Sequence, residues 1–298
     1  MKTFTIGKKK IVLKEEWMVG FITTWIVGLL AHAYRFFNFL PIWDSIYNFT
    51  GVGSTYTLGR WFLGYAGLIT SMFDLPWVNG AFSLFYISIV VILLTEMFEI
   101  KNKGMIVLCA AIFVSFPTVV SSFAYMYTAD AYLLAFLLAT LAVYLTWCVK
   151  KWGTIAGMVC LAFAMGIYQA YATVAIVLVL LYIIRQFVIE KLDFLEAVRK
   201  DLKYLGMLVG GAVLYAVILK ITLIRYNITL PGYQGIGALG IMSLGQYKAA
   251  LQKDAVSFQT DPWYGTWCGK TRLFLIKCSG IVADRTDLNI SFSTQSGL

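Results

Sequence analysis

Long apolar runs separated by short charged segments make up most of the sequence. Runs of about 20 apolar residues are long enough to cross the hydrocarbon core of a membrane as helices. The pattern predicts an all-α polytopic membrane protein with about seven transmembrane helices and a cytoplasmic N-terminus. We expect spans near residues 17–35, 79–98, 104–122, 130–149 and 204–226, and two more within 152–184.

The pair of spans follows from the stretch between Trp152 and Ile184, which carries no charged residue. As one helix it would be about 50 Å long, whereas the hydrocarbon core measures about 30 Å. Both flanks are basic, so the number of crossings between them is expected to be even. We therefore predict two short spans that meet on the outer side near Gly166, Tyr168 and Gln169.

Three further local features are predicted. Pro117 is expected to kink the third span near the outer surface. The segment from Gly59 to Trp77 is apolar but interrupted, which predicts a helix lying in the membrane interface. Apolar residues recur at helical spacing between charges from Glu190 to Lys203, which predicts a separate amphipathic helix on the cytoplasmic surface.

These elements define the expected domain organisation. It comprises a cytoplasmic tail (1–16), a helical bundle (17–226) with an outer loop (36–78) that carries the candidate chemistry, and an outer C-terminal segment (227–298), truncated or altered after about residue 265.

Composition agrees with a membrane protein, because 60% of the residues are hydrophobic and only 13% are charged, against roughly 25% in soluble domains. The net charge of +9 comes from Lys and Arg between the spans, as the positive-inside rule describes. No basic stripe with base-stacking aromatics lies outside the membrane, so nucleic acid is not an expected partner. The five cysteines lack CxxC spacing and support no disulfide framework.

Asp44 is the strongest candidate for catalysis. It lies in the loop between Trp43 and Tyr47, and we expect it to be partly buried among these aromatics. A carboxylate there can act as the general base on an acceptor hydroxyl. The alternative is an ordinary helix start after a proline.

Asp130 is a second candidate carboxylate at the same membrane face. It begins the fourth predicted span, so the alternative interpretation is an N-cap. Asp74 stands two residues before Pro76 and is interpreted as a turn residue.

Arg35 and Arg60 flank Asp44 and are candidates for binding a phosphate, which Arg contacts through two parallel hydrogen bonds. Attraction to lipid headgroups explains them equally well. His32, one turn before Arg35, is a further candidate phosphate donor or a packed polar group. As the only histidine, without acidic or thiol neighbours at ligand spacing, it indicates no metal site.

Aromatic residues gather at the expected outer ends of the spans. An interfacial aromatic belt explains them, and so does a set of stacking platforms for sugar rings, with Gln169 offering an amide to hydroxyl groups. The residues are Tyr125, Tyr127, Tyr132, Tyr168, Gln169 and Tyr171.

Four ordered motifs carry a resemblance to a known family. They are HAYRFFNFLPIWDSIYNFTGVGSTYTLGRWFLGY (32–65), FDLPWVNG (73–80), YTADAY (127–132) and GIYQAY (166–171). Over about residues 30–262 the chain resembles the bacterial serotype-converting O-antigen glucosyltransferases, polytopic enzymes of the GT-C fold class.

The resemblance implies an undecaprenyl-phosphate-glucose donor and a lipopolysaccharide O-antigen acceptor. It also implies a multi-pass protein of the bacterial inner membrane with a periplasm-facing site and no cofactor. Besides membrane lipids, the implied partners are a flippase for the glucosyl lipid and the synthase that makes it. The position of the family's essential acidic residue falls on Asp44, and Arg60 and Asp130 also lie in matching motifs.

The resulting hypothesis is a direct, inverting transfer. Asp44 takes the proton of the acceptor hydroxyl, and Arg60, helped by Arg35 or His32, stabilises the departing phosphate; Tyr127 and Gln169 contact the sugars. Two alternatives remain. A transporter or flippase of a lipid-linked sugar would place charges at mid-bilayer, and a truncated family member would keep the bundle but lose activity.

Overall fold

The fold is known from a computed structural model that describes residues 2–6, 9–47, 55–190 and 194–230. The chain divides into two units, Met1–Gly237 and Ala238–Leu298, and every described residue belongs to the first. The expected C-terminal segment therefore lies outside the described residues beyond position 230, as does the position near residue 265 after which truncation or alteration is expected.

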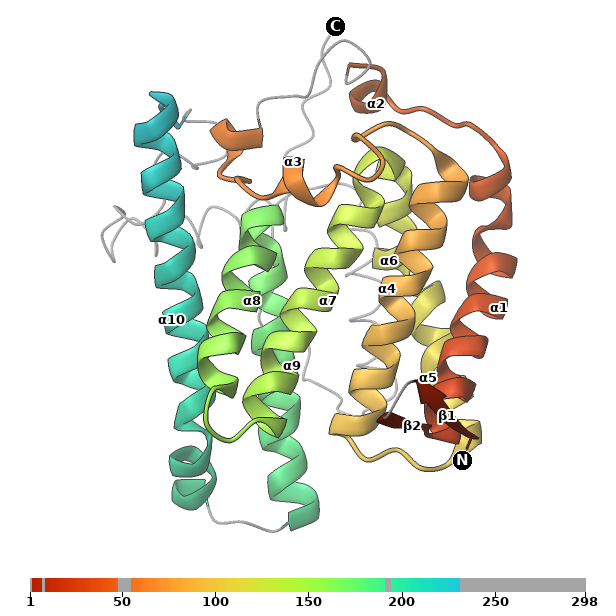
Figure 1. Cartoon of the computed structure of the whole chain (residues 1–298), viewed down its shortest axis with the longest axis vertical. Coiled ribbons are helices and arrows are strands. Elements are labelled where there is room, and N and C mark those ends of the chain that lie inside the picture. The colour runs from red at the N-terminus through yellow and green to blue at the C-terminus, as the bar shows by residue number, and fades with distance from the viewer. Residues whose placement is uncertain (1, 7–8, 48–54, 191–193, 231–298) are drawn as a thin grey trace, which may run out of the picture. The chain divides into compact units, whose positions relative to one another are not determined.

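Helices make up nearly all of the described chain (Figure 1). Two strands come first and pair antiparallel: β1 (Lys2–Ile6) and β2 (Lys9–Leu13). The long helices are α1 (Glu15–Phe37), α4 (Pro76–Met97), α5 (Lys103–Ser115), α7 (Met126–Cys148), α8 (Gly153–Ile167), α9 (Ala172–Arg185) and α10 (Phe194–Tyr226). The short ones are α2 (Trp43–Tyr47), α3 (Leu63–Ala66) and α6 (Pro117–Ser122), with 3-10 turns η2 (Thr55–Leu58), η3 (Phe123–Tyr125) and η4 (Gln169–Tyr171) and the π turn η5 (Gln186–Glu190).

The predicted all-α polytopic membrane fold is confirmed. In the described part of the chain, five helical segments are long and apolar enough to cross a membrane: Glu15–Phe37, Pro76–Met97, Lys103–Cys148, Gln169–Ile189 and Asp201–Tyr226. The seven expected spans differ from these five in two ways. First, the 46-residue third segment contains two of the expected spans, one formed by α5 and α6 and the other by α7. Second, the expected span at α8 is an apolar helix that is shorter than the five candidates.

One predicted chain reversal and one predicted helix break are confirmed. The uncharged stretch folds as α8 and α9, which meet at Tyr168 in extended conformation, next to Gly166 and Gln169 as expected. The third span breaks at Phe116, whose backbone is extended before Pro117, because a residue that precedes proline is disfavoured in helical conformation.

Two predicted helices are corrected. The segment from Gly59 to Trp77 is not an interfacial helix. It holds only the single turn α3 before α4 begins, and the backbone of Ser71 and Met72 adopts positive φ. Nor is there a separate surface helix at 190–203, since α10 runs unbroken from Phe194 into the last span.

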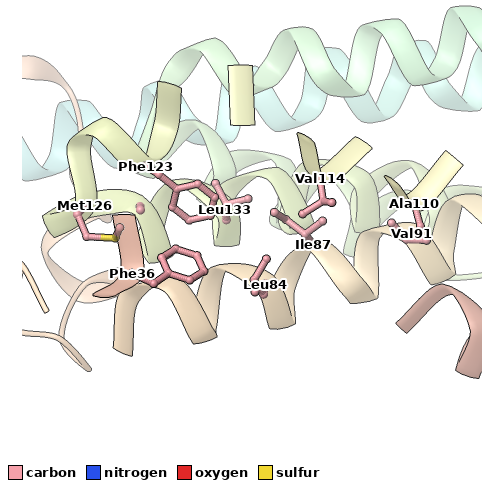
Figure 2. Close-up of a cluster of buried hydrophobic side chains, with 10 residues drawn as sticks. Phe36, Leu84, Ile87, Val91, Ala110, Val114, Phe123, Met126 and Leu133 are labelled. Carbon is pink, nitrogen blue, oxygen red and sulfur yellow. The ribbon is translucent and has the colours of Figure 1, made fainter. Parts of the chain in front are cut away.

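α7 packs between α4 and α8, and α10 packs against α8 (Figure 1). Figure 2 shows the apolar cluster between α1, α4, α5 and α7, where the rings of Phe36 and Phe123 meet edge to face at 5.2 Å. The other buried members are Leu84, Ile87, Val91, Ala110, Val114, Met126, Ala129 and Leu133. This cluster holds the first part of the bundle together below the outer loop.

The two ends of the bundle differ in character. The loop between α1 and α4 covers one end, called the loop end below, and the N-terminus lies at the other (Figure 1). Ion pairs between helices gather at the end opposite the loop: Lys14–Glu96, Lys103–Glu15 and Arg185–Glu99. The irregular chain and the candidate site residues gather at the loop end.

Close packing at Gly157 of α8 gives a test of this arrangement. A Cβ there would lie 2.6 Å from Thr146 Oγ1, 2.7 Å from the carbonyl oxygen of Ala142 and 2.9 Å from Met207 Cγ. We expect Gly157→Ala to destabilise the protein by about 1–3 kcal/mol, because the helices have to move apart. Thermal unfolding in detergent measures the effect.

Gly206→Ala is the matched control, since a Cβ at this α10 position meets nothing within 4 Å. Its replacement gains up to about 1 kcal/mol of helix propensity. Equal melting temperatures for the two variants would contradict the tight contact of α7, α8 and α10.

Candidate functional site

Hydrogen bonds from α8–α10 hold the outer loop in place. Gln169 donates from Nε2 to the carbonyl oxygen of Leu58 (2.8 Å) and to the hydroxyl of Tyr215 (2.9 Å). Tyr215 in turn donates to the carbonyl oxygen of Gly59 (3.0 Å). Gly59 has a φ of +72°, and a Cβ there would lie 2.6 Å from Gln169 Nε2, so only glycine suits this position. Gln169, predicted to bind sugar, thus positions the loop with its amide nitrogen.

Arg60 follows this anchor and lies among tyrosines. Its Nη1 donates to the hydroxyl of Tyr132 (3.1 Å), and its guanidinium carbon lies 4.5 Å from the centre of the Tyr168 ring. The two rings stack on each other at 5.5 Å. The Nε of Arg60 is buried and has no hydrogen-bond partner among the described residues. An aromatic ring of α7 and one of the α8–α9 turn therefore position a cation that retains donor capacity.

Tyr127 lies in the first turn of α7, near the charges of both Arg60 and Asp44. Its hydroxyl lies within electrostatic reach of the Asp44 carboxylate and of the Arg60 guanidinium. Asp44 stands in the first turn of α2 at the loop end (Figure 1) and is exposed, which corrects the expected partial burial. The structure thus brings together three of the predicted residues: a carboxylate, a hydroxyl and a guanidinium.

Arg35 has a different partner from the one expected. At the end of α1 it donates from Nε to the carbonyl oxygen of Phe123 (2.9 Å), and its Nη2 lies 3.7 Å from Asp74 Oδ2. The Asp74 side chain is 1% exposed. Neither of its oxygens accepts a hydrogen bond within the described chain. Burial raises the pKa of Asp74 above its ordinary value, and the charge of Arg35 and the nearby Ser45 hydroxyl only partly oppose that rise.

Asp130 is buried inside the bundle, below the loop. Its carboxylate accepts from Thr70 Oγ1 (3.0 Å) and from Asn79 Nδ2 (3.2 Å). Because α7 begins at Met126, Asp130 lies within the helix and is not its N-cap. It joins α7 to the loop and to α4, and it is 3% exposed.

His32 is not brought to the other site residues. It is buried within the bundle, with Nε2 2.9 Å from the carbonyl oxygen of Val114 and its ring 4.5 Å from that of Phe123. These contacts are those of a packed polar group between α1 and α5. In the part of the chain that the structure describes, no cluster of three or more His, Cys, Asp or Glu side chains is arranged to hold a metal ion.

Sequence reasoning missed two pairings. The Arg35–Asp74 pair joins residues from different ends of the loop, and spacing carries no signal for such a contact. The stacking of Tyr132 and Tyr168 around Arg60 had a partial signal, since both tyrosines belong to the aromatic set at the outer ends of the spans. The belt interpretation does not identify the cation that they hold.

Comparison with known proteins gives one match. The family model described as Glucosyl transferase GtrII matches residues 33–269. No curated protein and no solved structure matches the chain. The matched stretch contains Asp44, Arg60 and Asp130, whereas His32 falls one residue before it.

Asp130 is expected to contribute mainly to stability. Asp130→Ala leaves the Asn79 amide without its acceptor in a buried place, which costs about 1–3 kcal/mol. Asp44→Ala is the matched control, because Asp44 is exposed, and it should leave the melting temperature nearly unchanged. An Asp130→Ala protein as stable as wild type would show that these hydrogen bonds do not hold the loop.

Asp74 gives a pH-dependent stability. With a raised pKa, the folded protein keeps this proton to a higher pH than the unfolded chain does. The group therefore favours the folded state below its ordinary pKa of 3.8, and this advantage is lost as the pH rises through the folded pKa. We expect the unfolding free energy of wild type to fall relative to that of Asp74→Asn as the pH rises above about 4. Denaturant unfolding of both proteins measures it, and the opposite trend would show that Arg35 dominates.

Proposed function

The chain belongs to the glucosyl transferase GtrII family, and from that premise we propose that it transfers glucose from undecaprenyl-phosphate-glucose to a sugar of lipopolysaccharide O-antigen. The proposed place is the periplasmic face of the bacterial inner membrane. Family membership makes the chain a glycosyltransferase, and its apolar helices make it a membrane protein. The family match favours transfer over the alternative of lipid-linked sugar transport.

One observation carries the proposal for the site. Tyr127 lies within electrostatic reach of both Asp44 and Arg60 at the loop end of α7. A transfer between two sugars next to a membrane needs a base for the attacking hydroxyl and a cation for the departing phosphate. The carboxylate of Asp44 and the guanidinium of Arg60 can supply both, and the Tyr127 hydroxyl near them is suited to contact a sugar.

The proposed step is a single inverting displacement. The acceptor oxygen forms a bond to the anomeric carbon of glucose as the bond from that carbon to the phosphate oxygen breaks. The electron pair of the breaking bond passes to the phosphate, whose charge Arg60 stabilises, and the acceptor proton passes to Asp44. Arg can contact two phosphate oxygens at once, and the Nε of Arg60 has no hydrogen-bond partner in the described part of the chain.

The other predicted residues take supporting roles in this proposal. Arg35 faces Asp74 and the carbonyl oxygen of Phe123, and so its contribution is to order the loop. Asp130 and Gln169 position the loop through their hydrogen bonds with Thr70 and with the carbonyl oxygen of Leu58. The proposed partners are the lipid-linked donor, the O-antigen acceptor, a flippase and a synthase for the glucosyl lipid.

Asp44→Asn tests the central assignment. The variant keeps the size of the side chain but removes the base, and we expect transfer of labelled glucose in membrane vesicles to fall by about 10²–10⁴-fold. Glu196→Gln is the control, an exposed carboxylate in α10. Near-normal transfer by Asp44→Asn would remove the base assignment. A wild-type protein without transfer from this donor would contradict the proposed function.

A further inference from the structure

A cavity of about 370 Å³ opens near the loop end between α6, α7 and α9. We call it the α6–α9 cavity. Its apolar wall consists of Phe113, Val119, Leu133, Phe136 and Val174, and Tyr168 belongs to the same lining. Its volume lies within the range of about 300–1,000 Å³ that is typical of pockets for small ligands.

The α6–α9 cavity suits an apolar occupant. Two of its hydroxyl groups already have partners close by in the chain, since Ser122 donates to the carbonyl oxygen of Thr118 (2.9 Å) and Thr173 to that of Ala170 (2.6 Å). The remaining wall is mostly aliphatic and aromatic. A wall that offers few free donors and acceptors holds hydrocarbon better than water or sugar.

Tyr168 connects this cavity to the candidate site. Its ring lines the cavity and also lies 4.5 Å from the guanidinium carbon of Arg60. An apolar recess and a cation thus contact the same side chain. A ligand that fits both has a phosphate joined directly to a hydrocarbon chain.

We propose that the α6–α9 cavity binds the phosphate-proximal isoprene units of the lipid-linked donor, with Arg60 at the phosphate. The inference rests on the proposed function and adds the place where the donor's chain enters the protein. The volume admits only the beginning of a long isoprenoid, so the rest of the chain lies in the bilayer. Donor recognition then depends on the first isoprene units and on the phosphate, and little on total chain length.

Photo-crosslinking of the full wild-type chain tests the proposal without any mutation. The probe is farnesyl phosphate with a diazirine on the isoprene unit next to the phosphate. We expect adducts on the cavity wall, at Phe136 or Val174 or their neighbours, and we expect unlabelled farnesyl phosphate to compete. Adducts confined to the lipid-facing side of α10 would overturn the proposal. Equal competition by phosphatidylglycerol vesicles would also overturn it, because the cavity would then accept any lipid chain.

Filling the cavity gives a second, kinetic test. Val174→Trp places a large ring inside the α6–α9 cavity, and we expect it to raise the KM for undecaprenyl-phosphate-glucose at least about tenfold with little change in kcat. Val177→Trp is the control, since Val177 is 51% exposed on the same helix. A donor with a farnesyl chain should show the same pattern as the full-length donor. Unchanged KM in a folded Val174→Trp protein would overturn the proposal.

The two proposals fail in different ways. Wild-type transfer without cavity adducts would overturn the chain-binding inference and leave the glycosyltransferase function standing. If the protein does not transfer glucose but forms cavity adducts, and unlabelled farnesyl phosphate prevents their formation, the result would support the cavity and contradict the proposed donor sugar or acceptor.

Discussion

Irregular backbone that is shielded from water has to find its hydrogen-bond partners within the protein, and the loop finds two of them at Gln169, just after α8, and at Tyr215 of α10. The amide of Gln169 and the hydroxyl of Tyr215 satisfy the carbonyl oxygens of Leu58 and Gly59. This small network fixes the backbone just before Arg60. The cation could not meet the tyrosines of α7 and of the α8–α9 turn without it, and the candidate site depends on that meeting.

The charged groups at the loop end fall into two kinds of environment. Asp74 is buried and faces the partly buried Arg35, which ties the two ends of the loop together at an electrostatic cost for the carboxylate. Arg60 lies over an aromatic ring and keeps its Nε without a partner in the described structure. Asp44 is exposed. The paired charges, Arg35 and Asp74, therefore stabilise the fold of the loop. Arg60 and Asp44 are better placed to contact a substrate.

The helical bundle was largely predictable because span length, proline and charge each act locally. The reversal at Tyr168 followed from the length of an uncharged stretch with basic flanks, and the break at Phe116 from the proline after it. The loop was not predictable in the same way. Its conformation depends on partners far along the chain, such as the 111 residues that separate Leu58 from Gln169. Asp130 shows the same limit, since its role follows from contacts with Thr70 and Asn79 rather than from its place near a helix start.

The length of α10 has a mechanical consequence. The candidate span Asp201–Tyr226 has 26 residues, but its uncharged part runs only from Tyr204 to Leu219, which corresponds to about 24 Å of helix against about 30 Å of hydrocarbon. Such a hydrophobic mismatch is relieved by local thinning of the bilayer and by flanking cations such as Lys203 and Lys220 that reach towards the headgroups. Because Tyr215 on this helix contacts Gly59 in the loop, the depth of the helix in the bilayer and the position of the loop are linked. Bilayer thickness thereby becomes one of the variables that set the geometry around Arg60.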